Sequence, residues 1–298
     1  MRRYNAGTEG AALAGIAEQP MRRKLISPVV TICGIALLAV PAVWAAAGNA
    51  SEWVEGHSSR ARIIGGGDGV AAVELQLPEG WKTYWRSPGE AGGVPPSFDW
   101  SKSTNLEVAE VLYPAPKRFT DKADDTVGYK GNVVFPVRLK PKDASQPIDV
   151  RLALSYGVCK DICIPAEAEL ALSVPPSTGQ PMPEELITAM SRVPAPAEAR
   201  RETDPVLKRA VAELSGDKPR LLLETEFPGG TEHADVFVEA PDGLFVPLPK
   251  KIADDGKGAV TFEVDLSKDV DVAALKGKQL TATMVSDKGQ SEATFPLQ

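Results

Sequence analysis

The sequence predicts an all-β protein, a β-sandwich followed by a second and smaller β-domain. From about residue 60 onward, short runs alternate apolar and polar side chains and are interrupted by Pro, Gly, Asn and Asp. Alternation with a period of two is typical of strands that bury one face. Many short strands without long helical patterns favour a sandwich. Hydrophobic residues make up 43% of the 298 residues, enough for an ordinary globular core.

The strand-like runs fall into two blocks. The first block, 52–175, contains "VAAVELQLP", "LEVAEVLYP", "NVVFPVRLKP", "IDVRLALSY" and "AELALSV". The second block, 205–298, contains "RLLLETEF", "ADVFVEA", "GAVTFEVDL", "QLTATMVS" and "SEATFPL". Residues 176–204 between them are rich in proline at both ends and include one predicted short helix, Pro183 to Arg192. We therefore expect a first domain, a linker and an accessory β-domain with these bounds.

Residues 1–47 have the pattern of an N-terminal extension and a signal peptide. A basic stretch, Met21 to Lys24, precedes the apolar stretch Leu25 to Val43, and small residues follow at Ala45 and Ala47. An uncleaved anchor is the alternative. Cleavage would remove five basic and two acidic residues and leave 28 basic against 38 acidic ones, a net charge of about −10. This acidity disfavours nucleic acids and anionic membranes as partners, and we expect no membrane insertion after cleavage.

Export would leave two cysteines, Cys159 and Cys163, because Cys33 lies in the signal segment. In an oxidising compartment two cysteines most simply form one disulfide. Folding "IDVRLALSYGVCKDICIPAEAELALSV" into a hairpin with a three-residue tip puts the apolar residues of both strands on one face, for example Leu152 opposite Leu170. The same register sets Cys159 directly opposite Cys163, at roughly 4.5–5.5 Å between Cα atoms, which allows a disulfide.

The predicted disulfide would stabilise the fold only weakly. A closed loop of about five residues yields only about 2 kcal/mol on the chain-entropy estimate, and exposed disulfides are the more easily reduced ones. The bond therefore suits opening and closing. Two alternatives stay open: a purely structural hairpin disulfide, and a copper-tolerance protein that binds Cu(I) through both thiolates. Structural zinc needs four ligands, and the mature chain adds only His57 and His233; we expect no cofactor.

Four stretches of the first block carry a family likeness: "GWKTYWRSPGEAGGVPPSFDW", "YPAPKRF", "GYKGNVVFPV" and "YGVCKDICIPAEAEL". Together, and in this order, they resemble the periplasmic N-terminal region of the DsbD family of thiol:disulfide interchange proteins. The ScsB-like branch, named after suppression of copper sensitivity, is the most similar. The likeness covers about 55–175 strongly and the second block more loosely. It implies an immunoglobulin-like first domain, a periplasmic location and a thiol–disulfide oxidoreductase of the protein-disulfide reductase type.

The resemblance also implies the redox couple and its partners. Cys159 and Cys163 would exchange electrons with periplasmic thioredoxin-like proteins through a mixed disulfide, for which the family favours Cys163. Their C-x₃-C spacing is closer than in the best-known members, which leaves the local loop geometry open. The 298 residues contain no multi-helix membrane module and no thioredoxin-like C-x-x-C. A separate membrane protein is therefore the expected electron donor.

An aromatic cap loop shields the cysteines in the family, and "YWRSPGEAGGVPP", with Tyr84 and Trp85, is its expected counterpart here. Core packing is the alternative for these two side chains. Tyr156 and Pro165 flank the thiols and are expected to shape the docking surface, although Tyr156 also has the strand parity of the core.

The predicted hairpin tip carries two opposite charges. Lys160 favours a thiolate and Asp161 opposes it. The tip therefore predicts no net electrostatic preference between thiol and thiolate.

Overall fold

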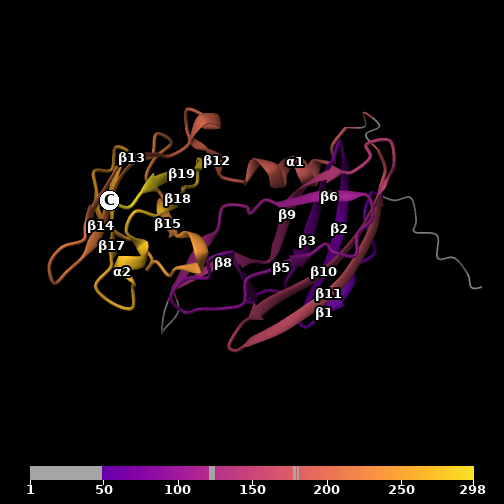
Figure 1. Cartoon of the computed structure of the whole chain (residues 1–298), viewed down its shortest axis with the longest axis horizontal. Helices are drawn as coiled ribbons and strands as arrows, with labels where there is room; N and C mark the ends of the chain where they lie inside the picture. The colour runs from indigo at the N-terminus through magenta and orange to yellow at the C-terminus, as the bar shows by residue number, and fades with distance from the viewer. Residues whose placement is uncertain (1–48, 121–124, 177–178, 180) are drawn as a thin grey trace, which may run out of the picture. The chain divides into compact units, whose positions relative to one another are not determined.

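The computed structural model describes residues 49–120, 125–176, 179 and 181–298 (Figure 1). The predicted extension and signal peptide, 1–47, lie outside the described residues. All described residues belong to one compact unit of the chain. None of their helices combines the length and the apolar character that crossing a membrane requires.

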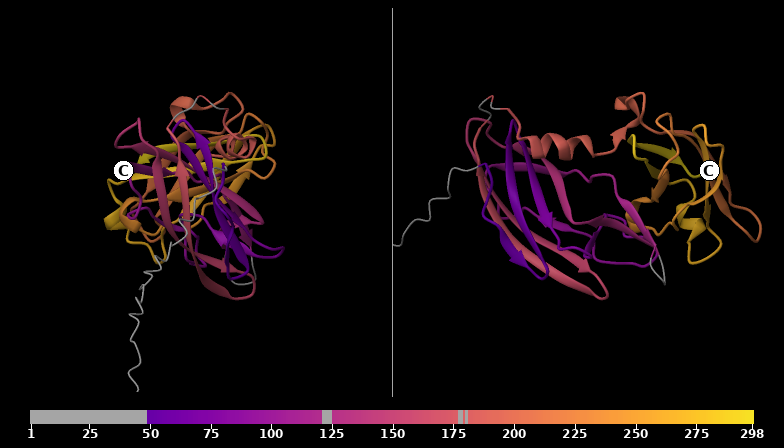
Figure 2. Two further views of the ribbon diagram at one scale, coloured as in Figure 1. Left: turned by 90° about the vertical axis from the view of Figure 1, so that its right-hand side faces the viewer. Right: turned by 180° about the vertical axis from the view of Figure 1, so that it is seen from behind.

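Two antiparallel sheets form the first sandwich, and the views in Figure 2 show them as facing layers. One sheet has the order β1-β2-β3-β9-β6 and the other β11-β10-β4-β8-β7, with β5 paired to β10. The bounds are β1 Val54–Gly56, β2 Ser59–Gly67, β3 Val70–Gln76, β4 Lys82–Tyr84, β5 Ser97–Asp99, β6 Leu106–Val111, β7 Lys117–Thr120, β8 Asp125–Lys130, β9 Asn132–Pro141, β10 Ile148–Cys159 and β11 Cys163–Val174.

The core of this sandwich lies between the two sheets. Alternation explains its composition: over 148–156 of β10 and 166–174 of β11 every second side chain is buried, as the period-two pattern requires. Trp85, Phe135 and Leu152 are among its largest fully buried members. Each such side chain contributes about 1.5–3 kcal/mol through burial. This core holds the long β10–β11 hairpin in place along most of its length.

A second pair of four-stranded sheets follows, with the orders β12-β19-β18-β15 and β13-β14-β17-β16. Their shared core includes Leu223, Phe227, Val236 and Phe262. The prediction of an all-β fold with two β-domains is therefore confirmed. The bounds are β12 Ala195–Pro196, β13 Val206–Glu213, β14 Arg220–Glu226, β15 Asp235–Glu239, β16 Lys250–Asp254, β17 Ala259–Asp265, β18 Gln279–Val285, β19 Gln290–Pro296 and α2 Val272–Leu275, with the 3-10 turns η1 Ala197–Ala199 and η2 Pro241–Gly243.

The segment between the sandwiches contains the helix α1, Glu184–Ser191. The helix is amphipathic and buries Leu186 and Ala189. Leu186 packs with Ile64 and Ala72, outside the main core of the first sandwich. The linker helix is thus docked onto the first sandwich by an apolar contact of its own.

Candidate redox site

The site lies at the end of the β10–β11 hairpin. The pairing runs without a bulge from Ile148 opposite Val174 to Cys159 opposite Cys163, which confirms the predicted register. The two cysteines form a disulfide, with 4.2 Å between their Cα atoms. An uninterrupted ladder whose apolar face is buried up to Ile164, next to the tip, leaves little freedom for slippage. The strand pattern of the sequence therefore positions the two sulfurs.

The two cysteines differ in exposure. Cys159 is 1% exposed, whereas Cys163 is exposed to solvent. The neighbouring Ile162 at the tip is 68% exposed, a large value for an apolar side chain. Of the two, Cys163 is therefore the cysteine more accessible to a thiolate that arrives from solvent.

Tyr84, at the end of β4, contacts both sulfurs. Its hydroxyl oxygen lies 2.7 Å from Sγ of Cys159 and 2.8 Å from Sγ of Cys163. Disulfide sulfurs carry no proton, so the tyrosine hydroxyl donates. Burial raises the pKa of Tyr84 above its ordinary value, which keeps the hydroxyl protonated and able to donate. A thiolate produced by reduction would accept this hydrogen bond more strongly than a neutral sulfur does.

The segment that follows β4 lies over Tyr84. We call residues 86–96 the cap segment. The amide of Gly157 on β10 donates to the carbonyl oxygen of Val94 at 2.9 Å. Gly93 has φ +151°, and a Cβ there would lie 2.3 Å from a ring carbon of Tyr84. Only glycine permits this close approach, so the cap segment rests directly on the tyrosine that holds the sulfurs.

The other residues predicted for the site lie in different surroundings. Trp85 is 1% exposed and packs in the core against Phe237, with 5.6 Å between ring centroids. Tyr156 is fully buried, and its hydroxyl lies 2.8 Å from Oγ of Ser59. Both side chains thus have the core-packing role that the sequence left as the alternative. Three predicted residues are solvent-exposed beside the sulfurs: Lys160, Asp161 and Pro165.

Lys82 also lies beside the disulfide, although the sequence did not single it out. It pairs with Cys159 across β4 and β10, so both side chains lie on the same face of the sheet. The lysine is 7% exposed, and its ammonium donates to Oγ1 of Thr126 at 3.2 Å. A cation on this face favours a thiolate. The only feature of the sequence that points to this position is its place two residues before Tyr84 in a short strand-like run, which puts both side chains on one face of the sheet.

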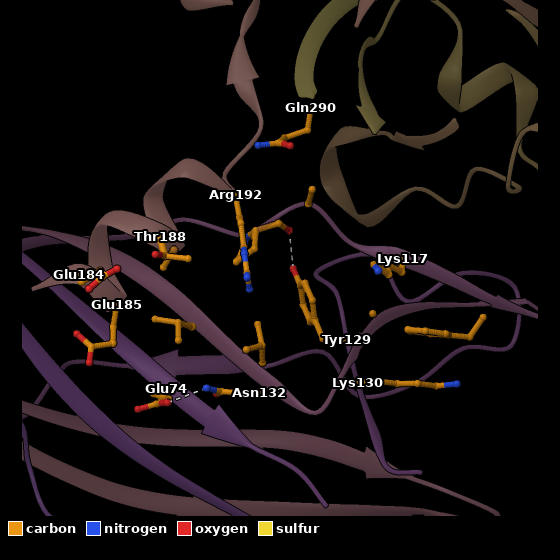
Figure 3. Close-up of a pocket in the computed structure, with 17 residues that line it drawn as sticks. Glu74, Lys117, Tyr129, Lys130, Asn132, Glu184, Glu185, Thr188, Arg192 and Gln290 are labelled. Atoms are coloured by element: carbon orange, nitrogen blue, oxygen red, sulfur yellow. Dashed lines mark hydrogen bonds between the residues drawn. The ribbon is translucent and has the colours of Figure 1, made fainter. Parts of the chain in front are cut away.

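A groove between α1 and the first sandwich is a separate feature (Figure 3). It has a volume of about 890 Å³ and is lined by cationic residues such as Lys117 and Arg192 and by the carboxylates of Glu184 and Glu185. Neither cysteine lines it. Its charges are mixed, and it contains none of the residues predicted for the site.

A group of side chains on the second sandwich could hold a metal ion: Glu232, His233 and Asp287, all exposed. The cysteine pair is not part of it. Two thiolates would by themselves be soft ligands for Cu(I).

Comparison with known proteins identifies the first sandwich. Residues 55–175 match the family described as "Thiol:disulfide interchange protein DsbD, N-terminal". The first sandwich is a DsbD N-terminal domain. The DsbD-type domain and its disulfide together support thiol–disulfide interchange in general as the activity. Residues 192–298 match a domain of unknown function, DUF8393.

A solved structure shares the fold of both sandwiches. It is the N-terminal periplasmic domain of ScsB from Proteus mirabilis, with a TM-score of 0.64 and 23% sequence identity. The match covers 84% of this chain and 98% of that one. No curated protein sequence matches the chain.

Proposed function

We propose that the protein is a periplasmic thiol–disulfide interchange protein that carries two electrons on Cys159 and Cys163, to or from thioredoxin-fold partners. The observation that carries the proposal is the disulfide itself, with one exposed cysteine, one buried cysteine and a single hydroxyl donor to both sulfurs. A separate membrane protein supplies the electrons in this scheme. The predicted division into domains at 52–175, 176–204 and 205–298 stays a proposal, as does cleavage of a signal peptide.

Reduction would begin at Cys163. A partner thiolate attacks its Sγ, the Cys159–Cys163 bond breaks, and the electron pair of that bond leaves with the sulfur of Cys159 as a thiolate. The hydrogen bond from Tyr84 and the cation of Lys82 favour that thiolate. The partner's second cysteine then attacks the partner sulfur of the mixed disulfide and releases Cys163. The partner leaves as a disulfide, and this chain holds the dithiol; the reverse sequence delivers both electrons.

A partner would dock over the cap segment and the hairpin tip. Two large apolar side chains on these segments are exposed, Val94 at 48% and Ile162 at 68%. Exposed apolar residues beside a reactive group mark contact surfaces. The cap segment must give way for a partner sulfur to approach Cys163 closely, because Gly93 rests on Tyr84.

The proposal is tested with two matched single-cysteine variants. A thioredoxin-fold protein activated as a mixed disulfide with thionitrobenzoate is mixed with Cys159→Ser, which retains the exposed Cys163, and with Cys163→Ser, which retains the buried Cys159. We expect Cys159→Ser to form the covalent complex far faster. Equal and slow reaction of both variants, together with stoichiometric Cu(I) binding by the reduced wild-type protein, would overturn the proposal in favour of the copper-binding alternative.

A further inference from the structure

Ion pairs join the start of the cap segment to the second sandwich. The guanidinium of Arg86 donates to both carboxylate oxygens of Glu239, at 2.7–3.0 Å, and to Glu292 at 2.6 Å. Glu239 ends β15 and Glu292 lies in β19. The same guanidinium stacks over the ring of Trp85 at 4.7 Å. The side chains of Arg86 and Glu239 are 30% and 18% exposed, so solvent screens this contact only in part.

A second contact joins the middle of the cap segment to the same sandwich. The carboxylate of Glu90 accepts a hydrogen bond from the amide of Leu248 at 3.3 Å. The side chains of Phe237, Leu248 and Val285 are buried in the core cluster of the first sandwich. The two sandwiches are therefore packed together where the cap segment begins, and two charged residues of the cap segment are fixed by this packing.

The other end of the cap segment covers the redox site. Only three residues separate Glu90 from Val94, whose carbonyl oxygen is bound by Gly157. Gly89 and Gly92 have φ values of +90° and +67°. Such glycines let the chain turn but give it little stiffness of its own. Backbone hydrogen bonds to β8 hold Pro88 and Ala91, at 2.8 Å to the amide of Val127 and 3.3 Å to the carbonyl oxygen of Asp125. The position of Gly93 on Tyr84 therefore depends on these bonds together with the contacts of Arg86 and Glu90 and the bond at Val94.

We propose that the 192–298 domain is a clamp for the cap segment: the carboxylates of Glu239 and Glu292 are positioning groups that hold Arg86, and through it hold Gly93 and Val94 over Tyr84 and the disulfide. This gives the second domain a role in setting how readily the sulfurs react. The inference rests on the proposed function only in that the cysteine pair is taken to be the reactive site. Release of Arg86 would open the cap without any change at the cysteines themselves.

The test compares two sets of substitutions at the same interface. The double variant Glu239→Gln/Glu292→Gln removes both negative charges that face Arg86 with little change of shape. The control, Asp235→Asn, weakens an ion pair of the same kind, in which Arg118 donates to Asp235 at 2.7 Å with similar burial. Arg118 lies in β7 and not in the cap segment. Both sets loosen contacts between the sandwiches, but only the first removes the partners of a cap-segment side chain.

Two readouts follow the cap directly: the rate at which iodoacetamide alkylates the reduced cysteines, and amide hydrogen exchange at Gly157, which is bound to Val94. The double variant is expected to raise both rates about fivefold. Loss of a partly screened ion pair costs about 1 kcal/mol, which raises the population of the open cap by about that factor. The control is expected to leave both near the wild-type values. Equal rates in the double variant and the control would overturn the proposal.

A conservative variant, Arg86→Lys, provides a second test if the double variant unfolds. Arg86→Lys retains the charge but loses the forked contact with Glu239, and it is expected to raise both rates by a smaller factor. Wild-type rates in Arg86→Lys would then overturn the clamp. Neither readout involves a partner protein. Loss of exchange with partners while the cap responds as expected would contradict the proposed function alone.

Discussion

Replacing Tyr84 by Phe removes one hydroxyl from the redox site and keeps the ring on which Gly93 rests. The hydroxyl donates to both sulfurs of the disulfide at 2.7 and 2.8 Å. A hydrogen bond to a charged group contributes about 1.5–3 kcal/mol and one to a neutral group about 0.5–1.5 kcal/mol. The variant should therefore destabilise the reduced thiolate, relative to the disulfide, by about 1 kcal/mol. That difference corresponds to a rise of about 0.7 in the cysteine pKa and a fall of about 20 mV in the reduction potential.

The assay measures the alkylation rate of the reduced protein by iodoacetamide against pH, for the wild type and Tyr84→Phe. The inflection gives the thiol pKa, and equilibration with glutathione buffers gives the potential. The control is Tyr156→Phe, which removes a hydroxyl bound to Ser59 and not to the sulfurs. We expect the control to leave both values unchanged. A wild-type pKa and a wild-type potential in Tyr84→Phe would refute the role assigned to the hydroxyl.

Three further predictions concern the scaffold. Leu152→Ala empties a fully buried position under the hairpin and should lower the free energy of unfolding by about 2–5 kcal/mol; urea denaturation measures it, and a loss below about 1 kcal/mol would contradict the account. Burial opposes ionisation of Asp204, but hydrogen bonds from Arg201 outweigh burial and hold the pKa of this carboxyl below its ordinary value. A carboxyl whose pKa is lower in the folded state stabilises the fold above its unfolded pKa of about 3.9, and this stability is lost as pH falls through the folded pKa. Asp204→Asn should therefore be less stable than the wild type at pH 7, and the difference in unfolding free energy should narrow below about pH 4 in urea titrations. A difference that widens in acid would contradict the lowered pKa. The hydrogen bond from His233 to Asp287 and the charge of that carboxylate raise the pKa of His233, and Asp287→Asn should return it toward about 6.5 in an NMR titration; an unchanged pKa would rule out the pairing.

Alternation along the chain is sufficient to predict the hairpin and its register. Because side chains in strands repeat with a period of two, a register shifted by one residue would expose the apolar set that includes Leu152. The opposition of Cys159 and Cys163 follows from that register alone. The position of the disulfide at the end of the hairpin is therefore predictable from the strand pattern.

Contacts between distant parts of the chain are not predictable in the same way. Arg86 and Glu239 are separated by 153 positions, and no periodic pattern links two such residues. Lys82 was missed because lysine in a strand is usually directed to solvent, whereas here it is buried beside Cys159. Tyr84 and Trp85 are neighbours whose side chains lie on opposite faces of the sheet at the end of β4. A prediction that assigns both to the cap can therefore be right for only one of them.

The reduction potential of the Cys159–Cys163 pair tests the central claim most directly. The mature protein would be equilibrated with glutathione redox buffers, and the fraction of free thiols determined by alkylation. An exchange protein should have a potential of roughly −120 to −270 mV. A value well below about −300 mV would mark an inert structural disulfide and would contradict thiol–disulfide interchange through this pair.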